Sequence, residues 1–219
     1  MLRSATRFLW IQSERASVAD LKLRGRAPLD DLARPGRFGA QTPKPGLVID
    51  ERTDLALATL IARRGETQNL RRAITAAFGL ALPDGPHVVT KDGLSFAGVG
   101  VGKWLAAAEG PAAVNYVSRL REHLTALASI ADQSDGRVVL RLSGERVREV
   151  LAKGIPLDLH PHKFKKGDVA STMISQIGVQ IQQLDDRPTF QLIAFRSFAG
   201  SLLSWLTKSA AEFGYEIAH

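Results

Sequence analysis

The stretch from Asp132 to Pro161 constrains the fold most, because it reads as a strand, a short helix and an abrupt stop. Apolar and other residues alternate over residues 137–142, which predicts a strand with one buried face. Ser143 is expected to cap the following helix, and Gly154 is expected to end it in the left-handed conformation. The pattern therefore predicts an element that presents the carboxylate of Asp158 just beyond a helix.

The same order of elements occurs twice along the chain. In the first half we expect a strand, a helix, short strands and a second helix: Leu55–Ile61, Thr67–Phe78, Val88–Val89, Leu94–Val101 and a long helix after Pro111. The second half repeats this order with the strand at 137–142, the short helix, strands at Ile174–Leu184 and Phe190–Phe195, and a last helix capped by Ser197. Two βαββα-like halves, at about residues 46–128 and 129–219, predict an α+β fold with mainly antiparallel sheets and packed helices.

Residues 1–45 read as an extended basic arm and linker that precedes the compact domain of residues 46–219. The arm holds nine basic and four acidic residues, so it supplies a surplus of five of the net charge of +7. It is interpreted either as a disordered tail or as an arm that becomes ordered across another subunit, with Trp10 and Phe38 as its anchors. No interleaved aromatic residues or zinc-finger spacing accompany this charge, so we expect no nucleic-acid partner.

The absence of cysteine excludes disulfides and a thiolate nucleophile, and it favours a reducing cytoplasm. No apolar run is long enough to span a bilayer, and the N-terminus lacks the pattern of a signal peptide, so we expect a cytoplasmic protein without a membrane partner. His160 and His162 flank a proline, but alternate residues of an extended segment point apart. We therefore expect no metal site.

Several motifs are shared in register with one known family: DQSDGR, RLSG, VLAKG, PLDLHP, DDRPTF, FRSFAGS and WLTKSAAEFG. Through them, from about Pro35 to the C-terminus, the sequence resembles the gamma subunit of heterotetrameric sarcosine oxidase. More distantly, it is similar to the folate-binding module of the glycine-cleavage T-protein and its aminomethyltransferase relatives. That second likeness rests on matching positions, namely Asp132, Ser134, Gly144 and Asp158.

The resemblance implies a partner more firmly than a reaction. Sarcosine oxidase of that family oxidatively demethylates sarcosine to glycine, with formation of hydrogen peroxide and 5,10-methylenetetrahydrofolate, and so belongs to sarcosine catabolism and one-carbon metabolism. Its FAD, FMN, NAD and tetrahydrofolate are implied to lie on the other subunits. The resemblance thus implies a non-catalytic accessory chain with a folate-module fold, which binds no cofactor itself and assembles with the larger alpha and beta subunits and the small delta subunit.

Asp158 and Arg196 are the candidate site residues. By resemblance to the T-protein, Asp158 is a vestigial acid that contacts the reacting end of folate, where a carboxylate stabilises a cationic nitrogen. The alternative is that Asp158 caps its own turn by accepting from nearby backbone N–H groups. Arg196 carries the same two interpretations, a helix cap or a contact to a ligand carboxylate.

Two functions remain open from the sequence. The first is an accessory gamma subunit that stabilises the alpha subunit and its folate region. The second is a free-standing, folate-binding enzyme of the aminomethyltransferase type. The motifs favour the first, because a shared fold does not by itself carry a shared activity.

Overall fold

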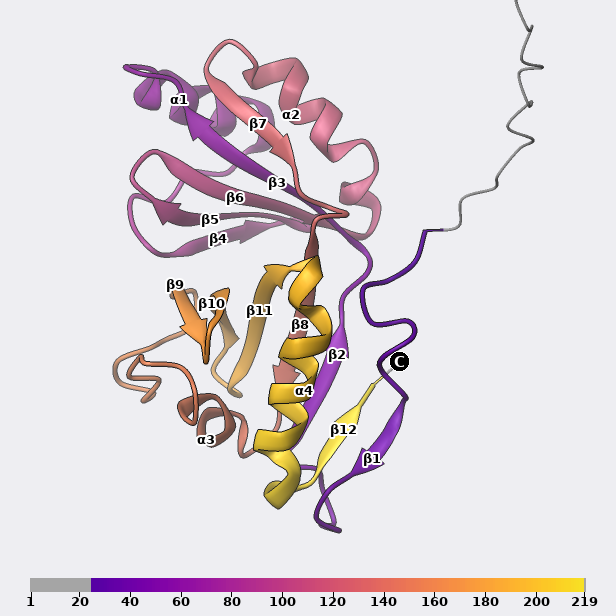
Figure 1. The fold of residues 1–219 in the computed structure, drawn as a ribbon. Helices are drawn as coiled ribbons and strands as arrows, with labels where there is room; N and C mark the ends of the chain where they lie inside the picture. The colour runs from indigo at the N-terminus through magenta and orange to yellow at the C-terminus, as the bar shows by residue number, and fades with distance from the viewer. Residues whose placement is uncertain (1–24, 219) are drawn as a thin grey trace, which may run out of the picture.

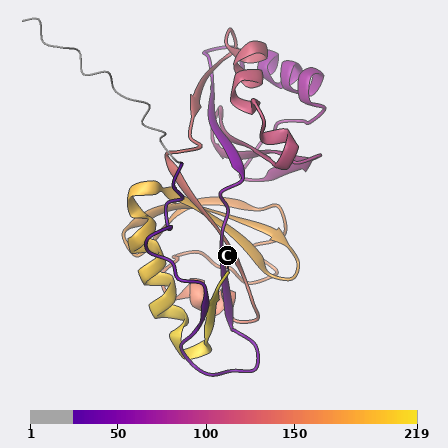
Figure 2. The same ribbon diagram turned by 90° about the vertical axis from the view of Figure 1, so that its right-hand side faces the viewer.

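The computed structural model describes residues 25–218, so the predicted anchor Trp10 lies outside the described residues. The chain forms two lobes, each of which is a β-sheet with helices on one face (Figures 1 and 2). The lobes are joined by two short connections, between β2 and β3 and between β7 and β8. This is the α+β architecture with mainly antiparallel sheets that the sequence predicts.

The upper lobe in Figure 1 contains a five-stranded antiparallel sheet of order β4-β5-β6-β3-β7. Its elements are β3 (Leu55–Ala62), α1 (Thr67–Phe78), β4 (Val88–Lys91), β5 (Leu94–Gly100), β6 (Lys103–Glu109), the 3₁₀ turn η1 (Gly110–Ala113), α2 (Tyr116–Leu124) and β7 (Ala128–Asp132). The helix after Pro111 is shorter than predicted, because a 3₁₀ turn occupies its expected first turn.

Helix α1 has the buried face that its sequence predicts. Leu70, Ile74 and Phe78 lie four residues apart, and all three are buried against the sheet. Gly79 then ends the helix with a φ of 66°, a conformation that favours glycine. The local sequence alone is sufficient to place this helix.

The lower lobe contains a seven-stranded sheet of order β1-β12-β2-β8-β11-β10-β9. Its elements are β1 (Gly36–Phe38), β2 (Leu47–Glu51), β8 (Arg137–Ser143), α3 (Val147–Ala152), β9 (Val169–Ile174), β10 (Ile177–Asp185), β11 (Thr189–Phe195), the 3₁₀ turn η2 (Arg196–Phe198), α4 (Ala199–Ala210), the 3₁₀ turn η3 (Ala211–Phe213) and β12 (Tyr215–Ile217). Among residues 25–218, only β12 and β2 pair in parallel. Helices α3 and α4 contribute to the core on one face of this sheet.

The predicted internal repeat is visible in both lobes. Each lobe has the order strand, helix, three strands, helix, strand, running from β3 to β7 and from β8 to β12. The lobes differ at two places. β7 pairs directly with β3, whereas β2 lies between β8 and β12, and β1 extends the lower sheet beyond β12. Strand β2 thus joins the sheet of the second half although it precedes the first in sequence.

Three local predictions around the helices are wrong. Ser143 remains in β8, where it pairs with Val48, and no side chain caps α3. Gly154 has no positive φ; a Cβ there would lie 2.4 Å from the Trp205 ring, so close packing is what requires the glycine. Ser197 lies in η2 and does not cap α4. For Ser143 and Gly154 a contact distant in sequence replaces the local one.

The predicted strand at Ile174–Leu184 is also wrong in detail. Ile174 ends β9, and Ser175 turns the chain with a φ of 55° into β10, so the segment contains a hairpin turn. Ile177, Val179 and Ile181 face the buried side as predicted. A serine in the left-handed conformation gives little signal in the sequence.

Residues 25–45 lie along the seven-stranded sheet. Leu29 is buried in the lower core, and β1 pairs with β12 at the edge of the sheet. Phe38 stacks on Tyr215 with ring centroids 5.5 Å apart. The contact of this arm with another subunit and the domain boundaries at residues 45 and 128 stay predictions.

The two sheets meet through a small apolar contact, to which each contributes two buried residues: Leu57, Leu105, Val139 and Ile193. On either side of this contact the lobes separate into a cleft. Polar and charged side chains line both of these clefts.

Candidate functional site

Asp158 lies exposed on the loop that follows α3. Its Oδ1 accepts a hydrogen bond from the backbone N–H of His160 at 2.9 Å. This is the turn-capping contact of the structural alternative. The contact of Asp158 with folate stays a prediction.

Arg196 begins η2, and its guanidinium donates a hydrogen bond to the backbone carbonyl of Arg26. It lines a cleft of about 560 Å³ between the lobes, which we call the arginine cleft. The charged residues of the arginine cleft are Arg26, Asp30, Glu51, Arg52, Asp135, Arg137 and Arg196. Asp158 does not line it, so the structure does not bring the two predicted site residues together.

The arginine cleft contains both acidic and basic side chains, and burial shifts the pKa of one of each kind. Burial raises the pKa of Glu51, whose carboxylate accepts the backbone N–H of Leu29 at 3.2 Å. Arg137 stacks on the exposed ring of Phe195, 4.0 Å from its centroid, and burial lowers the pKa of Arg137. Among the described residues, the arginine cleft therefore presents guanidinium groups from several separate segments of the chain.

His160 and His162 do not point apart as expected. Their ring centroids are 5.1 Å apart, because the chain turns at Pro161 and His160 Nδ1 accepts from the backbone N–H of His162. Within residues 25–218 there is no group of three His, Asp or Glu side chains placed to hold a metal ion.

The Asp132-x-Ser134 motif has a structural role in this chain. Asp132 Oδ1 accepts from the backbone N–H of Ser134 at 3.0 Å and from its hydroxyl at 2.8 Å. The Ser134 hydroxyl oxygen in turn accepts the backbone N–H of Leu57 at 3.0 Å. The motif thereby fixes the connection from β7 to β8 against β3.

A second cleft, of about 570 Å³, lies between the lobes, and we call it the glutamine cleft. Its floor is the polar face of β8, β10 and β11, and its wall is formed by residues of β4, β5 and β6. The polar residues that line it are His87, Thr90, Ser95, Glu109, Arg141, Lys166, Gln182, Gln183 and Gln191. The alternation of Ile177, Val179 and Ile181 with Gln176, Gln180 and Gln182 predicts a solvated face for the glutamines. For Gln182 this is wrong, because the residue is 5% exposed.

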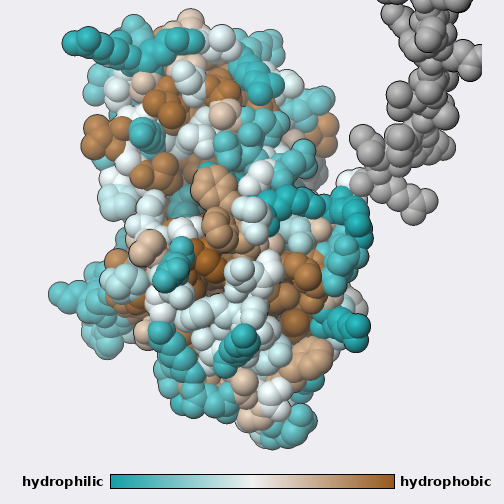
Figure 3. Space-filling model, viewed as in Figure 1, coloured by the Kyte–Doolittle hydropathy of each residue, from teal (hydrophilic) through white to brown (hydrophobic). Residues whose placement is uncertain are grey.

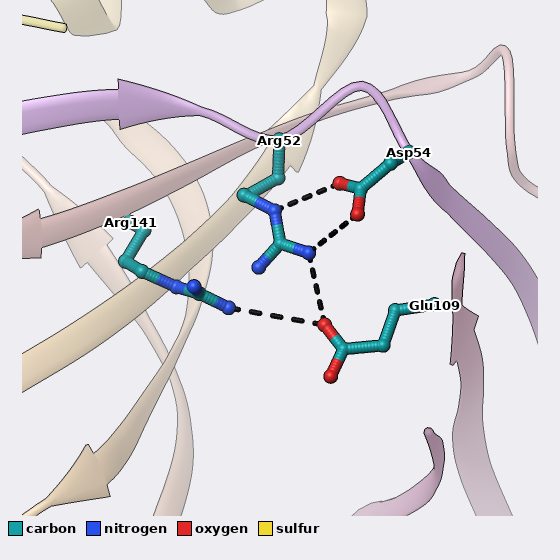
Figure 4. A network of polar contacts seen from close by, with 4 residues as sticks. All are labelled: Arg52, Asp54, Glu109 and Arg141. Carbon is teal, nitrogen blue, oxygen red and sulfur yellow. Dashed lines mark hydrogen bonds and ion pairs between the residues drawn. The ribbon is translucent and has the colours of Figure 1, made fainter.

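A charged cluster ties the lobes together beside the glutamine cleft (Figure 4). Arg52 donates to Asp54 at 2.7 and 2.8 Å and to Glu109 at 2.9 Å. Glu109 is also 4.0 Å from Arg141 Nη2. Arg52 and Asp54 lie in the connection between β2 and β3, Glu109 ends β6 and Arg141 lies in β8, so the cluster links the two lobes.

Replacing Asp54 with asparagine tests this cluster by its pH dependence. Hydrogen bonding to Arg52 lowers the pKa of Asp54 below the ordinary value of 3.8, so ionised Asp54 stabilises the fold above that value. The contribution is lost as the pH falls through the folded-state pKa. We expect Asp54→Asn to unfold more easily at pH 7, by up to about 1 kcal/mol, and to approach the wild type in acid.

The measurement is urea unfolding between about pH 3 and pH 7. Asp186→Asn, at an exposed aspartate in the β10–β11 turn, is the matched control and should change little at any pH. A difference between Asp54→Asn and the wild type that stays constant with pH would contradict the ion pair.

Comparison with known proteins gives the chain a family. The model of the family described as sarcosine oxidase, gamma subunit, matches residues 64–212. The chain belongs to the sarcosine oxidase gamma subunit family. The match includes the whole upper-lobe helical layer and continues through α4, so it covers both lobes.

Curated relatives and a solved structure agree with this assignment. The gamma subunits of sarcosine oxidase from Corynebacterium sp. strains U-96 and P-1 are 28% and 29% identical over 64% and 66% of this chain and 69% and 71% of their own length. A chain of heterotetrameric sarcosine oxidase from Corynebacterium sp. U-96 matches with a TM-score of 0.72 at 26% identity, covering 86% of this chain and 96% of that one.

The folate-module resemblance holds for the fold. The glycine-cleavage aminomethyltransferase T from Bartonella henselae matches with a TM-score of 0.56 at 14% identity, over 80% of this chain and 48% of that protein. This likeness confirms the aminomethyltransferase-type fold of the gamma-family chain. It carries no assignment of Asp158 or Arg196, because fold and function are separable.

No motif in the sequence identifies the polar residues of the glutamine cleft. The one available signal was the run of glutamines at alternate positions of β10, which typically marks a solvated face. In the gamma-family fold this face is covered by the other sheet. The strand register places Gln182 beside Gln191, and both residues line the glutamine cleft.

Proposed function

We propose that this chain is a non-catalytic accessory subunit of a heterotetrameric sarcosine oxidase. In this role it assembles with the alpha, beta and delta subunits and stabilises the alpha subunit next to its folate region. The observation that carries the proposal is the match over 96% of a chain of the solved heterotetramer, since it covers nearly that whole chain. The flavins, NAD and tetrahydrofolate are assigned to the other subunits.

Exposed apolar side chains support a role in assembly. Apolar residues gather along the middle of the face shown in Figure 3, while hydrophilic residues crowd its two ends. The most exposed large apolar residues of the described chain are Val101, Val114, Leu32, Met173, Phe195 and Phe198. Contiguous exposed apolar patches typically mark surfaces that a partner covers.

The cytoplasm is the proposed location. The chain has no cysteine, which suits a reducing compartment. No helix within residues 25–218 combines the length and the apolar character needed to cross a membrane.

Co-expression with the larger subunits tests the proposed function. We expect a tagged form of this chain to co-purify with the alpha subunit, and we expect the chain alone to show no binding of tetrahydrofolate by calorimetry. Micromolar binding of tetrahydrofolate by the isolated chain, without co-purification, would instead establish the free-standing aminomethyltransferase-like alternative.

The assembled complex then tests Asp158 directly. Asp158→Ala is expected to leave the stoichiometry and affinity of tetrahydrofolate unchanged, because its carboxylate accepts from the backbone of its own turn. Asp186→Ala, at another exposed turn aspartate, is the control. Loss of one folate equivalent only in Asp158→Ala would show that this chain contributes to a folate site.

A further inference from the structure

A row of polar side chains crosses three adjacent strands on the floor of the glutamine cleft. Gln182 of β10 is in register with Gln191 of β11, and Gln191 is in register with Arg141 of β8. All three line the cleft, and the two glutamines are 5% and 8% exposed. Cross-strand neighbours on one face have side chains in contact distance, so the row forms one continuous surface.

This row is more polar than packing between the sheets requires. One step away on the same face, Val139 and Ile193 make the apolar contact between the lobes. Burying amide and guanidinium groups is costly unless they are hydrogen-bonded. Arg141 Nε is buried and has no hydrogen-bond partner within residues 25–218, and the same holds for Nε2 of Gln180 nearby on β10.

The charge of Arg141 is only weakly balanced inside the cleft. Glu109 lies 2.9 Å from Arg52 but 4.0 Å from Arg141, so its carboxylate pairs mainly with Arg52 (Figure 4). Lys166 adds a second positive charge to the lining. The Arg141 side chain is 37% exposed, so its terminal guanidinium nitrogens are accessible from the cleft, and a planar guanidinium binds carboxylates through two hydrogen bonds.

We propose that the glutamine cleft binds a small carboxylate, which pairs with Arg141 and contacts the side-chain amides of Gln182 and Gln191. Its volume of about 570 Å³ is within the range of small-molecule sites. Glutamine amides both donate and accept, so the ligand class is a carboxylate that also carries an amide, amine or hydroxyl group. The inference goes beyond the accessory role and is independent of the other subunits.

N-acetylglycine is the probe, because it combines one carboxylate with one amide, and N-acetylglycinamide is the uncharged control. The full-length chain is labelled with ¹⁵N and titrated, with backbone and glutamine side-chain signals followed by NMR. We expect saturable binding of N-acetylglycine, with shifts concentrated at Arg141, Gln182 and Gln191. The uncharged control should bind at least about tenfold more weakly.

Substitution of Arg141 tests the charged contact. Arg141→Gln should weaken binding of N-acetylglycine at least about tenfold, whereas Arg121→Gln, at an exposed arginine of α2, should leave it unchanged. Gln191→Glu is a second variant, in which the new carboxylate lies in register with Arg141 and competes with the ligand. Circular dichroism and thermal unfolding establish that each variant is folded.

Three results would overturn the proposal. They are the absence of saturable binding to the wild-type chain up to about 10 mM, equal binding of N-acetylglycine and N-acetylglycinamide, and shifts confined to residues outside the glutamine cleft. If neither variant folds, the comparison of the two ligands and the mapped shifts on the wild-type chain decide the question.

Discussion

Gly144→Ala is expected to destabilise the chain by about 3 kcal/mol or more, a large fraction of the stability of a domain of this size. Gly144 has a φ of 119°, where side chains are strained. A Cβ there would lie 2.4 Å from the carbonyl oxygen of Gly46 and 2.9 Å from its carbonyl carbon. Because the clash is with backbone, the end of β8 would have to move away from the start of β2.

The measurement is urea or thermal unfolding of the full-length chain. Gly178→Ala is the matched control, since Gly178 lies in β10 without a positive φ and a Cβ there meets nothing within 4 Å. That control should change stability by no more than about 0.5 kcal/mol. Wild-type stability in Gly144→Ala would show that the close approach of β8 and β2 is incorrect.

Phe190→Ala is expected to cost about 3 to 5 kcal/mol, because it removes a fully buried ring from the lower core. The ring stacks against Phe164 at a centroid distance of 6.3 Å, and the guanidinium of Arg148 lies over it at 5.0 Å. The substitution leaves a cavity and also removes the aromatic face beneath a positive charge.

Phe198→Ala provides the control for Phe190, because this ring is 42% exposed at the start of α4. Its substitution should cost less than about 1 kcal/mol in the isolated chain. Chemical unfolding of both variants under the same conditions measures the difference. Equal losses would mean that the lower core is not organised around β11 as described.

Most of the local architecture was predictable where one segment contains its own signal. Helix α1 is defined by the spacing of Leu70, Ile74 and Phe78 together with Gly79, and the structure confirms all four. Strand β8 follows the alternation over residues 137–142. These predictions succeed because the spacing of buried residues depends only on the geometry of a helix or a strand.

The predicted caps failed where another part of the chain competes for the same residue. Ser143 was expected to cap α3, but pairing with Val48, far away in sequence, keeps it in β8. Gly154 was expected to adopt a positive φ, but its requirement is the ring of Trp205. A local pattern contains no information about such neighbours, so tertiary contacts override it.

The candidate site residues were likewise predictable only in part from the sequence. The motifs identified the family and the aminomethyltransferase-like fold, and they placed Asp158 after one helix and Arg196 just before another. They did not reveal that these two residues lie apart, or that Arg141, Gln182 and Gln191 form one row in a cleft. That row depends on the register of three strands and on the second sheet that covers it.

By itself, then, the sequence determined the family, the repeated order of strands and helices, and which residues of each strand share a face. Only the tertiary structure decided that β2 enters the sheet of the second half and that Gln182 and Gln191 are buried between two lobes. The physical reason is that alternation along a strand separates two faces, while the partner that covers a face comes from residues far away in the chain.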